Sequence, residues 1–457
     1  MLLGKRFQPF IDAAPICVMA RGIAENILDA KRIDALFERT ATKQYTRAWS
    51  FSALVDLMSQ VVLDIQPSVH AAYRSMAKHL GVSDQAVYDK LQHVEGHVAA
   101  ELVRDSARRA RPVIEELQAT VPPLLPGYHA KILDGNHLAA TEHRIAELRT
   151  TWAAPLPGQL LVVLDQERML ASDVIPCEDG HAQERSLLDQ VVATVQANDL
   201  WIADRNFCTR QFLWEIAQRL GFFLIRQHGN LTGKLLGKRR LRGRCATGFV
   251  FEQRLKIQLA TKRTLIVRRV TIALIQATRD GDKELHLLSN VPKDKATAMQ
   301  LADAYRQRWT IEVMFLEMTE TLSCEINTLG YPKAALFAFC LALQAYNAVS
   351  VIKASLRSVH GVKKIERELS GYYLALEIEQ MYAGMMVAIP PKHWEKAWGE
   401  LSPPELANVL KDLAGTIDLA KYQKTPRGPK KKAAKRTPYK NGHHISTAKV
   451  LAGRGVT

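Results

Sequence analysis

The spacing of apolar residues changes near residue 125. Before that point apolar residues recur three and four apart, as over Asn26–Phe37 and Phe51–Leu63, and this spacing predicts amphipathic helices. From Tyr128 onward, short apolar runs bounded by polar turns predict strands. We therefore expect a helical N-terminal part followed by an α/β domain.

The strand-forming runs define the order of elements in this second part. Three runs in succession predict antiparallel strands, and helix, strand, helix and strand follow; this order is typical of a ribonuclease H-like α/β fold. Thr297–Thr319 is predicted to form one long helix, and further helices follow to about Leu419. The predicted strands are Ala130–Asp134, Leu160–Leu164, Met169–Ile175, Leu200–Asp204 and Phe222–Arg226.

Composition excludes several classes of protein. Hydrophobic residues make up 47% and charged residues 24% of 457 residues, which is ordinary for globular proteins and excludes a mostly disordered chain. The longest apolar run, Ala334–Leu343, is shorter than the roughly 18 residues of a membrane span. The six cysteines form no C-x-x-C pair, which favours a reducing compartment over a disulfide framework or a zinc site. We expect a cytoplasmic protein with no membrane partner.

Basic residues are concentrated in two segments. Residues 226–270 hold 13 Lys or Arg against one acid, residues 421–457 hold 11 and no acid, and the net charge of +16 leaves −7 for the rest. This distribution is typical of a protein that grips a phosphate backbone, although a solubilising tail and a solvated hairpin are the alternatives. In the central segment, charge alternates with strand-forming residues, which favours nucleic acid. The candidate contacts there are Lys238, Arg239, Arg240, Arg242 and Arg244.

A second candidate for DNA binding lies at Met76–Leu91. Gly81 can take the left-handed conformation of a tight turn between helices, and Ser83 is a suitable N-cap for the second helix. The pattern resembles a helix-turn-helix, in which Gln85 and Tyr88 would face a major groove. An ordinary helical hairpin is the alternative, and the acidic residues of the second helix favour it.

Three carboxylates carry the candidate chemistry. Asp134 and Asp204 each end an apolar strand, and side chains at the ends of neighbouring strands project together. Tyr305, Arg308 and Glu312 fall at i, i+3 and i+7 and so share one helix face. Such carboxylates suit Mg²⁺ or Mn²⁺, and Arg308 can hold a phosphate while Glu312 faces the metal. The alternatives are turn-forming aspartates and a surface ion pair between Arg308 and Glu312.

These motifs resemble the DDE transposases of bacterial insertion sequences, of the insertion-sequence-4 type. The matching stretches are Ile132-Leu-Asp-Gly-Asn136, Ile202-Ala-Asp-Arg-Asn-Phe207, Tyr305 with Arg308 and Glu312, Gln44-Tyr-Thr-Arg47, and Phe51-Ser-Ala-Leu-Val55.

The resemblance implies a metal-binding catalytic triad of Asp134, Asp204 and Glu312 that holds two ions, with Tyr305 and Arg308 on DNA phosphates beside the scissile bond. It also implies a β-rich insertion before the glutamate, a double-stranded DNA substrate with terminal inverted repeats and a target, and a homodimer in a synaptic complex. One position departs from the family: Thr319 stands where a lysine is usual. Another cation such as Lys293 would have to substitute, or activity is impaired.

The predicted function is metal-dependent cut-and-paste transposition through end cleavage and strand transfer. A DNA-binding regulator, an inactive transposase copy and a ribonuclease H-like nuclease are the alternatives. Trp309, Phe249 and Phe251 are candidate stacking partners for a flipped base, with core packing the plainer role.

The predicted domains are a helical DNA-binding domain (1–122), two parts of a ribonuclease H-like core (123–228 and 293–352), a β-rich basic insertion (229–292), a helical C-terminal region (353–420) and a disordered basic tail (421–457).

Overall fold

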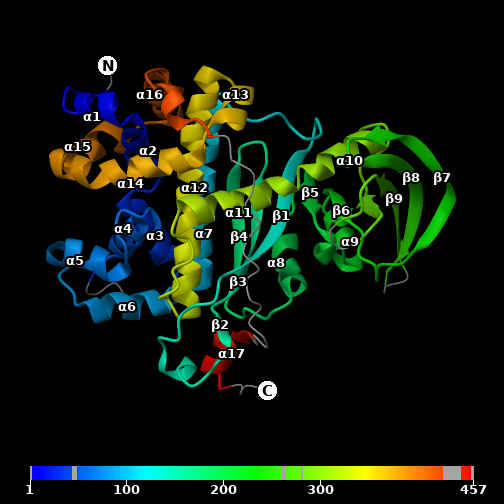
Figure 1. Ribbon diagram of the computed structural model, residues 1–457, viewed down its shortest axis with the longest axis horizontal. Helices are drawn as coiled ribbons and strands as arrows, with labels where there is room; N and C mark the ends of the chain where they lie inside the picture. The colour runs from blue at the N-terminus through cyan, green and yellow to red at the C-terminus, as the bar shows by residue number, and fades with distance from the viewer. Residues whose placement is uncertain (1–2, 44–48, 260–262, 279–280, 426–443, 454–457) are drawn as a thin grey trace.

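The fold is mixed α/β, with helices packed around one large sheet (Figure 1). A computed structural model describes residues 3–43, 49–259, 263–278, 281–425 and 444–453. The Gln44–Arg47 motif and most of the basic tail therefore lie outside the described residues. The N-terminal helices gather on one side of the sheet, and the strands of the insertion extend away on the other (Figure 1).

Helices α1 to α7 form the N-terminal part, as the apolar spacing predicts. Asp29, Ser50, Ser68 and Ser83 each cap a helix by accepting a backbone N–H three residues on. Gly81 ends α5 in the left-handed region, at a φ of 63°. The helices are α1 (Gln8–Ala13), α2 (Pro15–Ile27), α3 (Ala30–Thr40), α4 (Phe51–Val62), α5 (Val69–Leu80), α6 (Asp84–His93) and α7 (Gly96–Glu116).

A nine-stranded sheet forms the centre, in the order β4-β3-β1-β5-β6-β10-β9-β8-β7. β1 pairs antiparallel with β3 and parallel with β5, and β6 continues parallel to β5. The strands are β1 (His129–His137), β3 (Gln159–Asp165), β4 (Leu170–Cys177), β5 (Asp199–Ala203), β6 (Phe222–Arg226), β7 (Lys234–Cys245), β8 (Gly248–Gln258), β9 (Thr264–Leu274) and β10 (Glu284–Ser289).

The basic insertion continues this sheet. β10 pairs antiparallel with β6 on one side and with β9 on the other, so hydrogen bonds run unbroken from β4 to β7. β7 shifts register twice against β8, and such bulges increase strand twist. Figure 1 shows these strands curling at the far end of the molecule. The insertion is therefore part of the same layer as the strands that carry the aspartates.

Different helices cover the two faces of the sheet. Ile132, Ile202 and Leu224 pack with α4, α7 and α12 on one face, whereas Leu133, Trp201 and Phe223 pack with α8 and α9 on the other. The helices and short turns are η1 (Ala146–Leu148), η2 (Glu184–Leu187), α8 (Leu188–Val192), η3 (Arg205–Phe207), α9 (Arg210–Gln218), α10 (Ala298–Arg306), α11 (Trp309–Thr321) and α12 (Pro332–His360).

Helix α12 is longer than the apolar run within it. By length and composition it is apolar enough to cross a membrane, but 83% of its most apolar window is buried inside the protein, as in a core helix. Buried residues of α12 contribute to both large cores, with Phe337 and Phe339 in the core beside the sheet and Val351 and Leu356 in the core of the C-terminal helices.

The C-terminal region packs against α2 and α12. At its tightest contact, Gly22 of α2 lies against the buried ring of Trp398, where a Cβ would come within 2.3 Å. The remaining elements are β2 (Ala154–Leu156), α13 (Val362–Glu368), α14 (Gly371–Ala388), α15 (Pro391–Trp394), the π-helical turn η4 (Glu395–Gly399), α16 (Pro403–Gly415), η5 (Leu419–Tyr422), β11 (His444–Ser446) and α17 (Thr447–Leu451).

Part of the tail expected to be disordered is ordered. β11 pairs parallel with β2, and Lys449 of α17 forms an ion pair with Asp179 at 3.2 Å. Tyr422, at the start of that predicted tail, is buried and donates a hydrogen bond to Glu377. Composition alone suggested disorder, but these segments gain partners from residues far away in the sequence.

Candidate active site

Asp134 and Asp204 lie at the same edge of the sheet. The parallel pairing of β1 and β5 ends at Leu133 and Ala203, so each aspartate is the first residue beyond it. β1 itself runs on to His137 because its antiparallel pairing with β3 continues. Since each aspartate is two residues after an isoleucine of the same sheet face, both side chains lie on the face where α11 packs.

Helix α11 brings Arg308 and Glu312 to these aspartates. The predicted long helix is interrupted, with α10 ending at Arg306 and α11 beginning at Trp309. At this break, Arg308 donates to Asp134 Oδ2 at 3.1 Å and to Glu312 Oε1 at 2.5 Å. The Arg308 guanidinium thus binds both Asp134 of β1 and Glu312 of α11, which are 178 residues apart in the sequence.

Burial makes this a tightly coupled set of charges. Burial raises the pKa of Asp134 to about 7, with Asp204 and Glu312 raising it further and the Arg308 guanidinium opposing the rise. The effect of both other carboxylates on the pKa of Asp134 shows that all three lie close enough to interact. Two of the three predicted carboxylates, Asp134 and Glu312, share the Arg308 guanidinium, and Asp204 follows the strand next to that of Asp134.

Tyr305 and Arg308 turn inward. Burial raises the pKa of the Tyr305 phenol to about 12. The Arg308 side chain is only 15% exposed. Arg308 was predicted to hold a phosphate while Glu312 faced a metal, whereas in this structure Arg308 binds Glu312 itself.

The chemistry of the donors fits a hard divalent cation, since all three are carboxylates. Their arrangement does not yet form a metal site, because within the described residues no three His, Cys, Asp or Glu side chains are grouped so that they could hold one ion. Arg308 stands between Asp134 and Glu312. A cation shared by these two carboxylates would therefore replace the guanidinium.

Glu184 is a fourth carboxylate, and sequence reasoning missed it. Its Oε2 accepts a hydrogen bond from Asn206 Nδ2 at 3.3 Å, and its Oε1 lies against the backbone of Gly135. Burial raises its pKa, and the nearby charge of Asp204 raises it further. Glu184 sits in a short polar turn with no periodic pattern, so no local signal pointed to it.

The position of Thr319 gives the site no positive charge. Thr319 is exposed, and its hydroxyl donates to the carbonyl of Leu316 at 3.0 Å. α11 contains no lysine or arginine between Trp309 and Thr321. Lys293, the expected substitute, lines a cleft of about 430 Å³ in the insertion.

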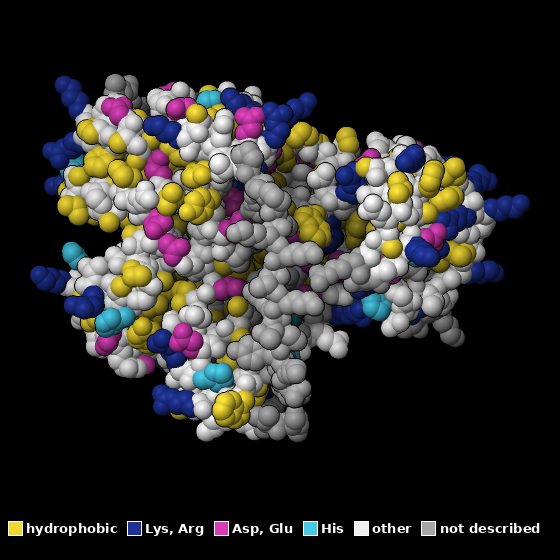
Figure 2. All heavy atoms as spheres, viewed as in Figure 1, with side chains coloured by type: hydrophobic (Ala, Val, Ile, Leu, Met, Phe, Trp, Pro, Cys, Tyr) yellow, Lys and Arg dark blue, Asp and Glu magenta, His cyan; other side chains and the backbone are white. Residues whose placement is uncertain are grey.

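That cleft and its surroundings contain the predicted basic contacts. Figure 2 shows Lys and Arg side chains at the outer rim of the insertion. Three of the five predicted residues interact with other side chains of the insertion. Arg239 forms an ion pair with Glu284 at 2.7 Å and stacks on the Phe251 ring. Arg242 forms an ion pair with Glu252 at 2.8 Å, and Arg244 lies over the Phe249 ring. Lys238 and Arg240 are exposed and line the cleft.

The two predicted contacts of the helix-turn-helix differ in exposure. Gln85 is exposed on α6 and donates to Asp89 at 2.8 Å. Tyr88 is half-buried and packs against the main core. Of these two residues, Gln85 is therefore exposed to solvent, whereas Tyr88 also contributes to core packing.

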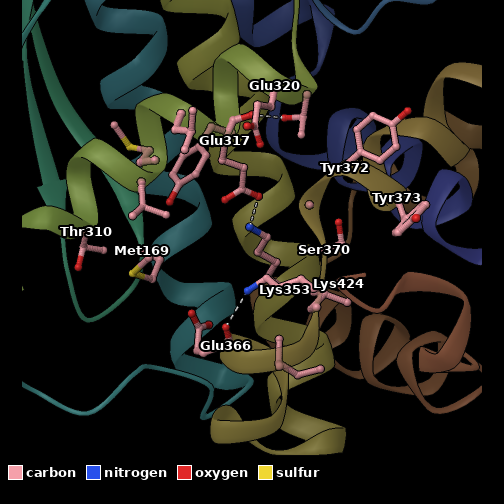
Figure 3. A pocket seen from close by; sticks show the side chains of 18 of the residues that line it. Met169, Thr310, Glu317, Glu320, Lys353, Glu366, Ser370, Tyr372, Tyr373 and Lys424 are labelled. Carbon is pink, nitrogen blue, oxygen red and sulfur yellow. Dashed lines mark hydrogen bonds and ion pairs between the residues drawn. The ribbon is translucent and has the colours of Figure 1, made fainter. Parts of the chain in front are cut away.

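An open groove of about 1050 Å³ lies along the outer side of α11, between α12, α13 and α14 (Figure 3). Glu317 and Lys353 form an ion pair in it, and Arg357 pairs with Glu366 at 2.9 Å. Trp309 lines this groove and is 61% exposed. Core packing was therefore the wrong expectation for Trp309, and it was also wrong for Phe249, which is 46% exposed.

Residues 129–348 match the transposase DDE domain. Asp134, Asp204 and Glu312 all lie within the matched residues. The curated protein named "Putative transposase y4zB" of Sinorhizobium fredii is 29% identical over 125 residues, which cover 26% of this chain and 33% of that protein. The match thus spans about a third of the relative's length.

Among solved structures, a piggyBac transposase synaptic complex with hairpin DNA aligns over 88% of this chain and 85% of that chain, with a TM-score of 0.39 and 11% identity. The match to the transposase DDE domain and the similarity to the putative transposase agree with the predicted family over these residues, while the insertion-sequence-4 type stays a prediction.

Proposed function

We propose that this chain is a transposase that excises its own mobile element from DNA and joins it to a target, by cut-and-paste chemistry. The observation that carries the proposal is that Asp134 and Glu312 share Arg308 while Asp204 follows the strand next to Asp134, inside the stretch that matches the transposase DDE domain. These residues come from β1, the end of β5 and α11. Their assembly therefore depends on the fold of the whole domain.

The order of elements supports a ribonuclease H-like core for this reaction. β1, β3 and β4 are antiparallel neighbours, and α8, β5, α9 and β6 follow with β5 and β6 parallel to β1. This is the order predicted from the sequence. The two aspartates follow the paired stretch of two adjacent strands, which supports the proposal of a shared metal site.

In the proposed chemistry, Asp134, Asp204 and Glu312 would hold Mg²⁺ or Mn²⁺, which supplies positive charge for the leaving oxygen. With a cation on Asp134 and Glu312, Arg308 would be free to hold phosphate oxygens with its two-pronged guanidinium. In the first step a water oxygen bonds to phosphorus and the bond from phosphorus to O3′ breaks, which leaves a 3′-hydroxyl. In the second step that hydroxyl gives up its proton and its oxygen bonds to a target phosphorus, while the bond from that phosphorus to the target's O3′ breaks and O3′ takes up a proton as a new 3′-hydroxyl.

Double-stranded DNA is the proposed partner, both as the terminal inverted repeats of the element and as the target. The exposed cations of the insertion, Lys238 and Arg240, would contact the backbone of the bound end. Cutting two ends in concert calls for two active sites, so we propose a homodimer in the synaptic complex. The reaction would take place on DNA of the bacterial nucleoid.

The test is cleavage of labelled DNA that carries the repeats flanking the gene, with Mg²⁺ or Mn²⁺. The wild type should nick at the repeat boundary, and Asp204→Asn should lose cleavage while binding the fragment normally. Asp189→Asn, an exposed aspartate of α8, is the matched control and should cleave as the wild type does. Cleavage retained in Asp204→Asn would remove this residue from the metal site.

A second candidate function is DNA binding without catalysis, as in a regulator or an inactive copy. It is favoured by the lack of a cation at Thr319 and by Arg308 standing between two carboxylates. Tight binding without cleavage in the wild type would support it. Thr319→Lys then separates an inactive copy, in which cleavage should return, from a regulator, in which it should not.

A further inference from the structure

The short turn η2 is bonded to the loop that follows Asp204. Arg185 Nε donates to the backbone carbonyl of Asn206 at 2.7 Å, and Glu184 accepts from the Asn206 side chain at 3.3 Å. The backbone N–H of Asn206 in turn donates to Asp204 Oδ1 at 2.5 Å. Two side chains of η2 therefore hold the residue whose backbone orients the Asp204 carboxylate.

The same glutamate also contacts the strand that carries Asp134. A Cβ on Gly135 would lie 1.9 Å from Glu184 Oε1, so the carboxylate occupies the space that any other residue's side chain would fill. The Gly135 N–H donates to Asp134 Oδ1 at 3.0 Å. Gly135 does not have a positive φ. The glycine is thus explained by the close approach of Glu184 and not by backbone conformation.

These contacts place Glu184 between the two aspartates. One oxygen of its carboxylate lies on the residue after Asp134, and the other bonds the residue two after Asp204. Asp134 and Asp204 carry like charges on neighbouring strands and repel each other, so their side chains need such support to stay close. Groups that support metal ligands in this way often affect metal affinity about 10–100-fold.

We propose that Glu184 is a positioning residue that fixes Asp134 and Asp204 side by side for cation binding, acting through Gly135 and Asn206. This inference rests on the proposed function for its metal, but it concerns residues that lie outside the predicted triad. It also assigns a purpose to the glycine and the asparagine that follow the two aspartates in Asp134-Gly-Asn and Asp204-Arg-Asn.

The test is a double-mutant cycle with Mn²⁺ affinity, measured by calorimetry on the full chain without DNA, as the first readout. Glu184→Ala should weaken Mn²⁺ binding by about 10–100-fold. Gly135→Ala should weaken it similarly, because the new Cβ pushes the Glu184 carboxylate away from its place. The double variant should be no weaker than either single one, since both remove the same support. Glu184→Gln keeps an oxygen for Asn206 and should recover part of the affinity.

The second readout is the Mn²⁺ concentration that gives half-maximal DNA cleavage, which should rise by the same factor in Glu184→Ala. Glu178→Ala, an exposed glutamate just after β4, is the matched control and should leave both readouts unchanged. Unchanged Mn²⁺ affinity in Glu184→Ala, or fully additive effects in the double variant, would overturn the proposal. If the variants shift Mn²⁺ affinity as expected but the wild type cleaves no DNA, the positioning role stands and the proposed function fails.

Discussion

Replacing Asp134 with asparagine should stabilise the protein at alkaline pH. Burial raises the pKa of Asp134 from 3.8 to about 7 in the folded state, so the folded chain holds a proton between these values that the unfolded chain releases. The stability associated with this group is complete below about pH 4 and is lost as the pH rises through about 7. The asparagine side chain cannot ionise, so Asp134→Asn avoids this loss.

The difference between the two pKa values sets the size of the effect. A rise of about 3 units corresponds to about 4 kcal/mol in the free energy of unfolding once Asp134 is fully ionised. If the 457 residues unfold as one unit, this is about 4 °C in Tm. The Asp134→Asn variant should therefore unfold at the same temperature as the wild type at about pH 4 and about 4 °C higher at about pH 8.5.

Thermal unfolding in EDTA across this pH range measures the effect, and added Mg²⁺ provides the control. Mg²⁺ should raise the Tm of the wild type at the alkaline end and have a smaller effect on Asp134→Asn, which lacks a ligand charge. If the variant were less stable than the wild type at the alkaline end, the ion pair with Arg308 would outweigh the cost of burying the carboxylate, and our explanation of the raised pKa would be refuted.

Three further predictions concern DNA binding and packing. Lys238→Gln and Arg240→Gln neutralise exposed cations of the insertion. The negative slope of log K against log salt should become shallower by about 0.9 for each phosphate contact that is lost, and an unchanged slope would place the DNA elsewhere. Gln85→Ala with Tyr88→Phe should weaken binding to the element's ends more than to random DNA in a mobility-shift assay, whereas equal weakening would indicate a plain helical hairpin. Gly22→Ala should destabilise the fold by about 1–3 kcal/mol because its Cβ would meet the Trp398 ring. Gly384→Ala, at an exposed position of α14, should stabilise the fold by about 0.5–1 kcal/mol. Similar urea midpoints for the two variants would contradict this prediction.

The local patterns predicted the framework of the site well. The apolar runs before Asp134 and Asp204 are strands, and Arg308 pairs with Glu312, four residues later in the sequence. These features could be predicted because strand ends and helix faces depend on residues close together in the sequence.

What could not be predicted depends on contacts between distant residues. No proline or glycine marks the break between α10 and α11 in the sequence. At this break Arg308 binds Asp134, which is 174 residues away in the sequence. Glu184 joins the site only because η2 packs beside the loop after β5. The ordered segment at β11 is likewise held by β2, which lies almost 300 residues earlier. No periodicity or composition signal carries such information.

The unbroken sheet from β4 to β7 has a mechanical consequence. Because β10 is hydrogen-bonded to both β6 and β9, backbone hydrogen bonds join the described strands of the insertion to the strands beside the carboxylates and restrain their relative movement. A polymer bound at β7 would lie at a distance from Asp204 that is set by the number of strands between β7 and β5 and by the spacing between neighbouring strands. The place of the cut would then be set by spacing along the DNA, and adding or removing a base pair between grip and cut would shift the bond that is broken.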